Sequence, residues 1–206
     1  MSGTHAAGLL ATVSARLGEA GHRGRAVRVV RIAELTEEIR RRRQAGELND
    51  TLYLEWLARF DGGASGVPVG TRSVIVAATP QPMLRLTFER DGTGHAAIVP
   101  PTYFNDTDRQ VGDLLNAALR PHGYGIQQAS LPVKLLAVRS GLAEYGRNNI
   151  TYIPGMGSFF RLTAFYTDAP LVEIEWREPR LAVACRRCSA CRSSCPAGAI
   201  ASDRFL

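Results

Sequence analysis

The feature that most constrains this chain is a run of four cysteines near residue 206. Cys185, Cys188, Cys191 and Cys195 are the only cysteines in the sequence, and they are spaced C-x₂-C-x₂-C-x₃-C before Pro196. Three thiolates two residues apart on a tight loop can each reach a different iron of one cubic cluster. The fourth precedes a proline and is turned away from that cube. The run therefore predicts a cluster-binding segment.

This spacing is typical of ferredoxin-like segments that hold 4Fe-4S clusters on thiolates. Structural zinc is the main alternative, but it usually takes two separated C-x₂-C knuckles or a mixture of Cys and His. Disulfides are a weaker alternative, because nothing else in the sequence suggests a secreted chain. In two-cluster ferredoxins the fourth cysteine ligates the other cluster, and no second run follows here. We therefore expect a ferredoxin-like segment over residues 176–206 that is truncated before a second run.

Composition and charge limit the other possibilities. The chain is 45% hydrophobic and 21% charged, with no apolar run near eighteen residues and no signal peptide, so we expect no membrane span. Thiolate ligands need a reducing compartment, which predicts the cytoplasm. The net charge of +6 comes almost entirely from arginine, since Lys134 is the only lysine. It favours an anionic partner such as RNA, with a solvated surface as the alternative, and we expect no DNA binding.

Helical and strand-like stretches alternate before the cysteines. Amphipathic periodicity predicts helices over 5–21, 36–46, 49–60, 105–120 and 130–140. Thr36 is the expected N-cap of the second. Apolar and β-branched stretches predict strands over 25–32, 73–78, 84–90, 95–99, 149–153 and 158–167, the last two paired with each other. Asp91-Gly92-Thr93-Gly94 predicts a hairpin between the strands over 84–90 and 95–99. This interleaving predicts an α/β (α+β) domain over residues 1–175, joined to the cysteine run by residues 170–180.

A second constellation lies at residues 140–149. Gly141 and Gly146 are followed closely by Arg147, Asn148 and Asn149, and glycines let backbone amides approach a bound group. The alternative is that Gly141 ends a helix and Gly146 makes a turn. The sequence contains no G-x-G-x-x-G after a strand, no phosphate-binding G-x-x-x-x-G-K-[ST] and no G-x-S-x-G. It therefore predicts neither a nucleotide site of those types nor a serine hydrolase.

Five stretches of the sequence, taken in order, resemble the epoxyqueuosine reductases and their relatives. These are cobalamin-dependent iron–sulfur proteins that are distantly similar to reductive dehalogenases. The matching pieces are Ser73 to Ala77, Ala137 to Asn148, Gly157 to Phe160, Thr167-Asp168 and the cysteine run to Ile200. The resemblance implies a nitroreductase-like α/β domain with a mixed sheet that binds cobalamin, followed by a two-cluster ferredoxin-like domain. Clusters would pass electrons to cobalt, and the substrate would be an epoxide in a modified tRNA base.

The resemblance also implies roles for particular residues. The expected cobalamin contacts are Ser140, Gly141, Leu142, Tyr145, Gly146, Arg147, Asn148, Gly157 and Ser158. An acidic proton donor is expected at Asp106 or Asp108, with a helix N-cap as the alternative for Asp106. The family's Asp-Tyr-His sequence at the acid is absent here, which leaves the substrate open.

The implied partners are tRNA and an electron donor of flavodoxin or ferredoxin type. A 4Fe-4S electron-transfer protein without corrinoid is the alternative function, and an RNA-binding protein with a vestigial cluster site is a further one.

Overall fold

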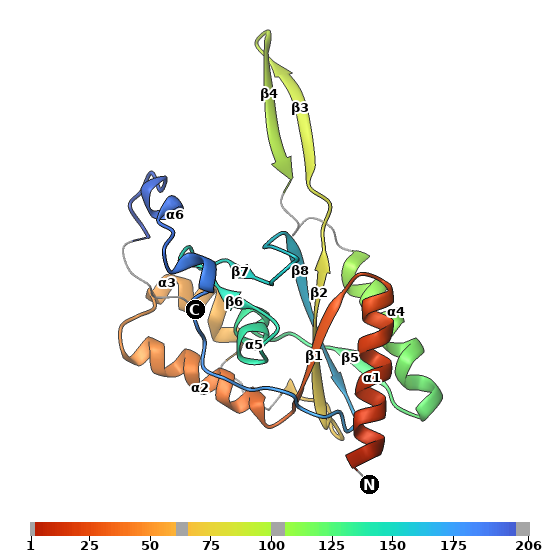
Figure 1. Cartoon of the computed structure of the whole chain (residues 1–206). Helices are drawn as coiled ribbons and strands as arrows, with labels where there is room; N and C mark the ends of the chain where they lie inside the picture. Colours follow the sequence, from red (N-terminus) through yellow and green to blue (C-terminus); the bar gives the residue numbers. More distant parts are fainter. Residues whose placement is uncertain (1–2, 61–65, 100–105, 201–206) are drawn as a thin grey trace.

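The computed structural model describes residues 3–60, 66–99 and 106–200. Its centre is a four-stranded sheet in the order β1-β2-β8-β5 (Figure 1). The strands are β1 (Arg23–Arg28), β2 (Ser73–Pro80), β8 (Phe160–Thr167) and β5 (Ile126–Gln128). This is the mixed α/β architecture that the alternation of helices and strands predicted.

All pairs in this sheet are antiparallel, so the prediction of a mixed sheet is wrong. The connection from β1 to β2 explains the difference. Arg28, the last residue of β1, lies opposite Ser73, the first residue of β2. The helices between the two strands therefore leave and return at the same end of the sheet, whereas a parallel crossover would return at the opposite end.

Helices cover both faces of the sheet. α1 (Gly3–Glu19) and α4 (Asp106–Leu119) lie on one side, and α2 (Arg31–Gln44) and α5 (Val133–Arg139) lie on the other (Figure 1). The first layer packs Leu17 and Leu115 against Ile75, and the second packs Leu35 and Leu136 around Val76. Strand β2 is buried on both faces along its first seven residues, as its continuous apolar run predicted.

Helix α2 begins five residues before its predicted N-cap. Val30 occupies the cap position, and Thr36 lies inside the helix with 8% of its surface exposed. The Thr36 hydroxyl donates to the carbonyl oxygens of Ile32 and Phe60, at 3.3 and 3.2 Å. The prediction of a strand to residue 32 and a cap at Thr36 is therefore wrong. Burial of Ile32 and Leu35 decides where this helix begins.

The predicted helix over 49–60 is three short helical pieces. Asn49 caps α3 (Asp50–Leu52), a π-helix (η1, Tyr53–Leu57) follows, and a 3₁₀ turn (η2, Ala58–Phe60) ends the stretch. Leu52 and Trp56 are 45% and 58% exposed, while Tyr53 is buried.

The two strands expected over 149–167 do not pair with each other as predicted. β7 (Thr151–Tyr152) pairs with β6 (Glu144–Tyr145), whereas β8 enters the central sheet beside β2. A single bridge between Ile153 and Gly157 is what remains of the expected hairpin.

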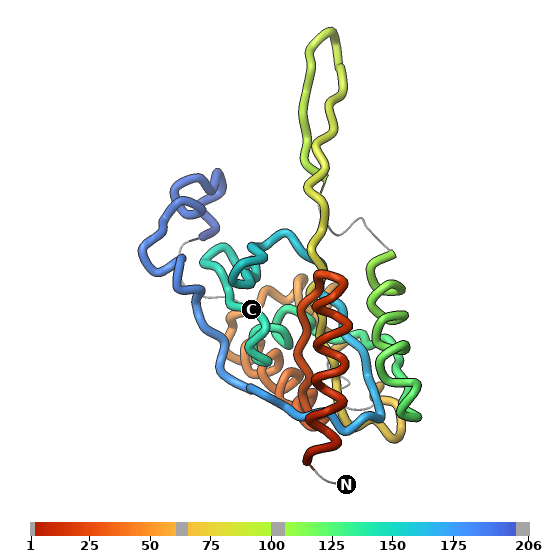
Figure 2. Tube along the Cα trace, turned by 45° about the vertical axis from the view of Figure 1, so that its right-hand side comes forward, coloured from red at the N-terminus to blue at the C-terminus, as the bar shows by residue number. Residues whose placement is uncertain are grey.

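The predicted hairpin is confirmed. β3 (Leu84–Arg90) and β4 (Thr93–Val99) form a two-stranded ribbon that stands away from the body (Figures 1 and 2). Asp91 and Gly92 have φ of 53° and 73°, the two positive values that a type I′ turn requires.

The remaining described elements are short. A 3₁₀ turn (η5, Arg120–His122) follows α4, another (η6, Val183–Cys185) begins the cysteine run, and α6 (Ala190–Ser193) lies within it. A search of the described helices found none with the length and apolar character needed to cross a membrane.

Candidate cofactor site

The four cysteines lie on a loop at the edge of the molecule. None of their thiols is in a disulfide, Cys188 is exposed, and the other three are partly buried. Among the residues described, no three His, Cys, Asp or Glu side chains converge as ligands of a metal ion. The donor set nevertheless has the chemistry of a cluster site, because it supplies four unpaired thiols at ferredoxin spacing. Thiolate ligation therefore fits these residues.

The backbone after Cys195 favours its thiolate. Hydrogen bonds from the backbone of Ala199 and Ala197, with smaller contributions from Ile200 and Gly198, lower the pKa of the Cys195 thiol. Amide donors around a sulfur stabilise the ionised form, which is the form that binds metal.

Residues 170–182, which we call the strap, fix the cysteine segment to the body. The strap crosses α2 and α5 before it reaches η6 (Figures 1 and 2). Glu173 accepts a 2.8 Å bond from Arg31, and the Trp176 indole nitrogen donates to Glu34 at 2.7 Å. Burial alone would raise the pKa of Glu173, but hydrogen bonds from Arg31 and from the backbone N–H of Arg28 outweigh it and lower that pKa. The segment predicted as a simple link is thus held along its length.

The end of the strap pairs with the glycine-containing loop. The backbone N–H of Tyr145 donates to the Arg180 carbonyl at 3.1 Å, and the N–H of Ala182 donates to the Tyr145 carbonyl at 2.7 Å. The Arg147 guanidinium then donates to the carbonyl of Cys185 at 3.0 Å. Two groups of residues singled out from the sequence, the Arg147 loop and the first cysteine, are therefore brought together.

Three of the expected cofactor contacts are instead in the core. Ser140, Leu142 and Tyr145 are 0%, 4% and 0% exposed. The Ser140 hydroxyl donates to the carbonyl of Ala137 at 3.1 Å, and burial raises the pKa of Tyr145. Their side chains support the loop from beneath.

The glycines differ in what surrounds them. A Cβ on Gly141, which has φ of +74°, would lie 2.1 Å from a Glu175 oxygen, and one on Gly146 would lie 2.3 Å from the Tyr152 ring. Gly157, with φ of +78°, has no heavy atom within 4 Å of the Cβ position. Gly146 is thus required by packing and Gly141 by its backbone conformation, while the backbone at Gly157 faces open space.

The remaining expected contacts lie beside these glycines and are less buried. Arg147, Asn148 and Ser158 are each partly exposed. The Asn148 amide donates to the Tyr152 hydroxyl at 3.2 Å, and its oxygen accepts from the backbone N–H of Ile150. Of the expected contacts, Gly157 is exposed, and Gly141, Arg147, Asn148 and Ser158 are partly exposed.

The two candidate acids have different environments. Asp106 is the first residue of α4 and is 77% exposed, with an oxygen 3.6 Å from Arg109. Asp108 accepts bonds of 2.6 and 2.9 Å from the Arg161 guanidinium and a third from Gln128 at 2.9 Å. The Asp108 contact also raises the pKa of Arg161. Asp106 lies in the solvent, whereas Asp108 is fixed in a bidentate pair.

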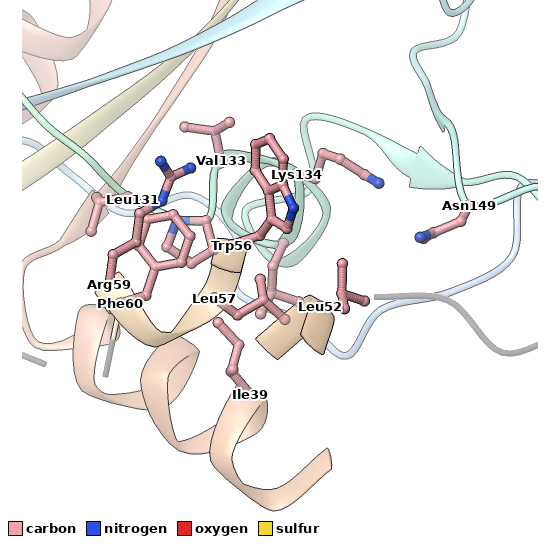
Figure 3. Close-up of a pocket in the computed structure, with 12 residues that line it drawn as sticks. Ile39, Leu52, Trp56, Leu57, Arg59, Phe60, Leu131, Val133, Lys134 and Asn149 are labelled. Carbon is pink, nitrogen blue, oxygen red and sulfur yellow. The ribbon is translucent and has the colours of Figure 1, made fainter. Parts of the chain in front are cut away.

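A cavity of about 390 Å³ lies between η1, η2 and α5 (Figure 3). Trp56 is among the residues that line it, and the side chains of Lys134 and Asn149 point toward one another (Figure 3). Lys134 keeps solvent contact, yet the protein atoms around its ammonium lower its pKa by burial. Sequence reasoning missed this site. The only signals for it in the sequence were Trp56 and the single lysine, Lys134.

A second, more polar cavity of about 370 Å³ lies next to the first, and Phe60 and Leu131 line both. Gln127, Gln128 and Tyr166 line it, and burial raises the pKa of Tyr166. Because Gln128 donates to Asp108, that carboxylate is one hydrogen bond from this second cavity.

The proteins to which the chain is similar are oxidoreductases, as their names state, and they share its mixed α/β fold. Two of the relatives found by sequence are epoxyqueuosine reductases. The chain is 27% identical over 100 residues to that of Francisella cf. novicida (strain Fx1), which covers 48% of this chain and 27% of the relative. It is 29% identical over 136 residues to that of Pseudomonas aeruginosa, covering 65% and 35%. The resemblance predicted from the sequence is confirmed.

A shorter stretch is similar to a reductive dehalogenase. Over 69 residues the chain is 35% identical to a tetrachloroethene reductive dehalogenase of Desulfitobacterium hafniense, which covers 34% of this chain and 12% of that protein. No family model matches the chain.

Solved structures show the same fold. An epoxyqueuosine reductase crystallised with an epoxyqueuosine-modified tRNA-Tyr stem loop superposes with a TM-score of 0.66 at 17% identity, covering 94% of this chain and 53% of that one. The enzyme from Bacillus subtilis gives 0.66 at 16%, covering 94% and 54%. The chain therefore spans about half of these structures and a smaller share of the sequence relatives.

Proposed function

We propose that this chain is the core of an iron–sulfur reductase that acts, like the epoxyqueuosine reductases, on a modified base in tRNA. Its α/β part over residues 1–175 would be nitroreductase-like, and residues from 176 onward would begin a ferredoxin-like segment. The observation that carries the proposal is the contact between Arg147 and Cys185, because it joins the cluster segment to the loop expected to face the cofactor.

The chain's own residues supply the electron path. Cys185, Cys188, Cys191 and Cys195 would hold 4Fe-4S clusters as thiolates, and the lowered pKa of Cys195 supports this role. The strap keeps the run against β6, so the distance from cluster to loop is set by hydrogen bonds and not by a flexible linker. A fixed short separation suits electron transfer from a flavodoxin- or ferredoxin-type donor.

A corrinoid is the second cofactor that we propose. The open backbone at Gly157, with the partly exposed Arg147, Asn148 and Ser158, fits a group bound across the surface beside the cysteines. Ser140, Leu142 and Tyr145 would position this surface without touching the group. When bound, the corrinoid would supply the reducing equivalents that remove an epoxide oxygen.

The basic character of the chain supports tRNA as the substrate class. Arg186 and Arg187 are exposed between two of the cysteines, and the net charge is +6. Asp108 is the candidate acid nearer to the polar cavity, through Gln128, and its bidentate pair with Arg161 would have to open before it could carry a proton. Asp106 would then have only a structural role, as the first residue of α4. A reducing, cytoplasmic location follows from the thiolate ligands.

The proposal is tested by metal analysis followed by an assay of catalytic turnover. The natural protein is purified anaerobically from cells supplied with cobalamin, and iron, sulfide and cobalt are measured per chain. Cobalt together with iron, and reduction of epoxyqueuosine in a tRNA-Tyr stem loop, are the expected results. The matched variant Arg147→Met should keep its iron and lose turnover, while Arg120→Met on the far side of the sheet should change neither.

Iron without cobalt would instead favour a 4Fe-4S electron-transfer protein. Zinc in place of iron would contradict the proposal altogether.

A further inference from the structure

The β3–β4 ribbon presents an apolar surface that the body does not cover. Every described residue of the two strands is exposed except Val99, which is partly buried. Leu84, Leu86 and Phe88, which share one face of β3, are 41%, 55% and 51% exposed. A two-stranded hairpin is marginally stable by itself in water, and an exposed apolar surface of this kind usually marks an interaction site. The ribbon therefore needs a partner.

The turn determines which backbone groups of β3 are free. In a two-residue type I′ hairpin, the residues that flank the turn, here Arg90 and Thr93, exchange both hydrogen bonds. Hydrogen-bonded and non-hydrogen-bonded pairs then alternate along the ribbon. The backbone N–H and C=O groups of Arg85, Thr87 and Glu89 consequently point away from β4. They form an open edge, because β3 and β4 are the only members of their sheet among the residues described.

We propose that two copies of this protein pair along β3, antiparallel, about a twofold axis at Thr87. In this register Arg85 lies opposite Glu89 of the second copy, and Leu86 lies opposite Phe88 of the second copy. Thr87 lies opposite its own equivalent. Opposite charges, aromatic–aliphatic pairs and Thr–Thr pairs are all favourable across antiparallel strands. The register also uses the outward-pointing groups at positions 85, 87 and 89, which gives about six new backbone hydrogen bonds.

Two of the other registers that use those backbone groups place like charges opposite one another. An axis at Arg85 would place two arginines opposite one another, and an axis at Glu89 would place two glutamates opposite one another. Like charges directly opposite are destabilising. Registers with an axis at Leu86 or Phe88 place Thr87 opposite Arg85 or Glu89, and so they lack the two opposite-charge pairs. The positions of Arg85 and Glu89 thus favour the register centred on Thr87.

A second copy fits this edge better than a nucleic acid does. The described ribbon carries two arginines, at 85 and 90, against Glu89 and Asp91, so it has no excess of positive charge for phosphates. The β4 edge offers no similar self-complementarity, because Gly94, Ala96 and Ile98 are uncharged. The assembly would be a four-stranded antiparallel sheet in the order β4-β3-β3-β4, with the two bodies at opposite ends.

The experiment measures self-association of the natural protein by sedimentation equilibrium, together with three hairpin variants. Arg85→Glu places two glutamates opposite one another, and Glu89→Arg places two arginines opposite one another. Each single variant should weaken the dimer roughly 10- to 30-fold, because both symmetry-related pairs become repulsive. The double variant Arg85→Glu/Glu89→Arg restores opposite charges, and its affinity should return close to that of the unchanged protein.

Arg120→Glu is the matched control. It makes the same change in net charge as Arg85→Glu at an exposed position after α4, and it should leave the dimer unchanged. Thermal unfolding of every variant confirms that the fold is retained, which the full exposure of both hairpin positions favours. A monomeric natural protein would overturn the proposal. So would a dimer that survives both single reversals, or a double variant that stays as weak as the singles.

Discussion

At the scale of single residues, Gly146 shows how closely the cofactor loop is packed. A Cβ at this position would lie 2.3 Å from Cε2 of Tyr152 and 2.7 Å from Oδ1 of Asn148. Gly146→Ala must therefore displace the tyrosine ring and disturb its bond with the Asn148 amide. We expect a loss of roughly 1–3 kcal/mol in the free energy of unfolding, measured by urea denaturation.

Gly8→Ala is the control for this prediction. Gly8 lies inside α1 with no atom within 4 Å of its Cβ position, so alanine should stabilise the helix by about 1 kcal/mol. Equal effects of the two substitutions would contradict the packing argument.

Sequence reasoning was reliable for residues whose roles are local. The Asp91-Gly92 pair predicted its hairpin because a type I′ turn requires two positive φ values. The same reasoning failed for Thr36, because its residue type suits an N-cap while its position is fixed by contacts with Phe60, far along the chain. It also missed the cavity, since Trp56 and Lys134 meet only after folding.

At the scale of elements, the strap depends on carboxylates that must stay ionised. Hydrogen bonds from arginines hold the pKa of Glu173 and of Glu34 below their ordinary value of 4.5, in spite of burial. A lowered folded-state pKa contributes stability that is present above the unfolded pKa and lost as the pH falls through the folded one. The strap should therefore loosen below about pH 4.5.

The substitution Glu173→Gln tests whether the ionised carboxylate of Glu173 holds the strap. It should lower the free energy of unfolding by about 1–3 kcal/mol at pH 7, and this difference should shrink toward pH 3 as the natural carboxylate takes up protons. Glu37→Gln on the exposed face of α2 is the control and should have a small effect at both pH values. A pH-independent difference for Glu173→Gln would exclude the ionised carboxylate as the cause.

The sheet was predictable as a set of strands but not in its pairing. β2 was recognisable because its continuous apolar run of five residues, 74–78, suits a strand that is buried on both faces. The partner of β8 was not, since nothing local distinguishes pairing with the near β7 from pairing with the distant β2. Tertiary packing decides that choice, and so it decides the antiparallel character of the sheet.

At the scale of the whole molecule, the cysteine segment and the α/β body form one hydrogen-bonded unit through the strap. Any group that binds the folded cysteines should therefore stabilise the body as well. We expect iron removal by an anaerobic chelator to lower the melting temperature of the entire protein, measured by circular dichroism of its helices. The shift should be smaller in Glu173→Gln, where the strap is weakened. An unchanged melting temperature would mean that the two parts unfold independently.

The π-helix at Tyr53–Leu57 has a consequence that can be put in terms of insertion and deletion. A π-turn holds one residue more than the α-turn it replaces, so this segment behaves like a helix that has gained a single residue. Because a π-turn and an α-turn each complete about one revolution, removing one residue there would leave the chain beyond the segment running in nearly the same direction. The extra residue therefore acts within the segment, where it sets the angle between the buried Tyr53 and the exposed Trp56 that lines the cavity.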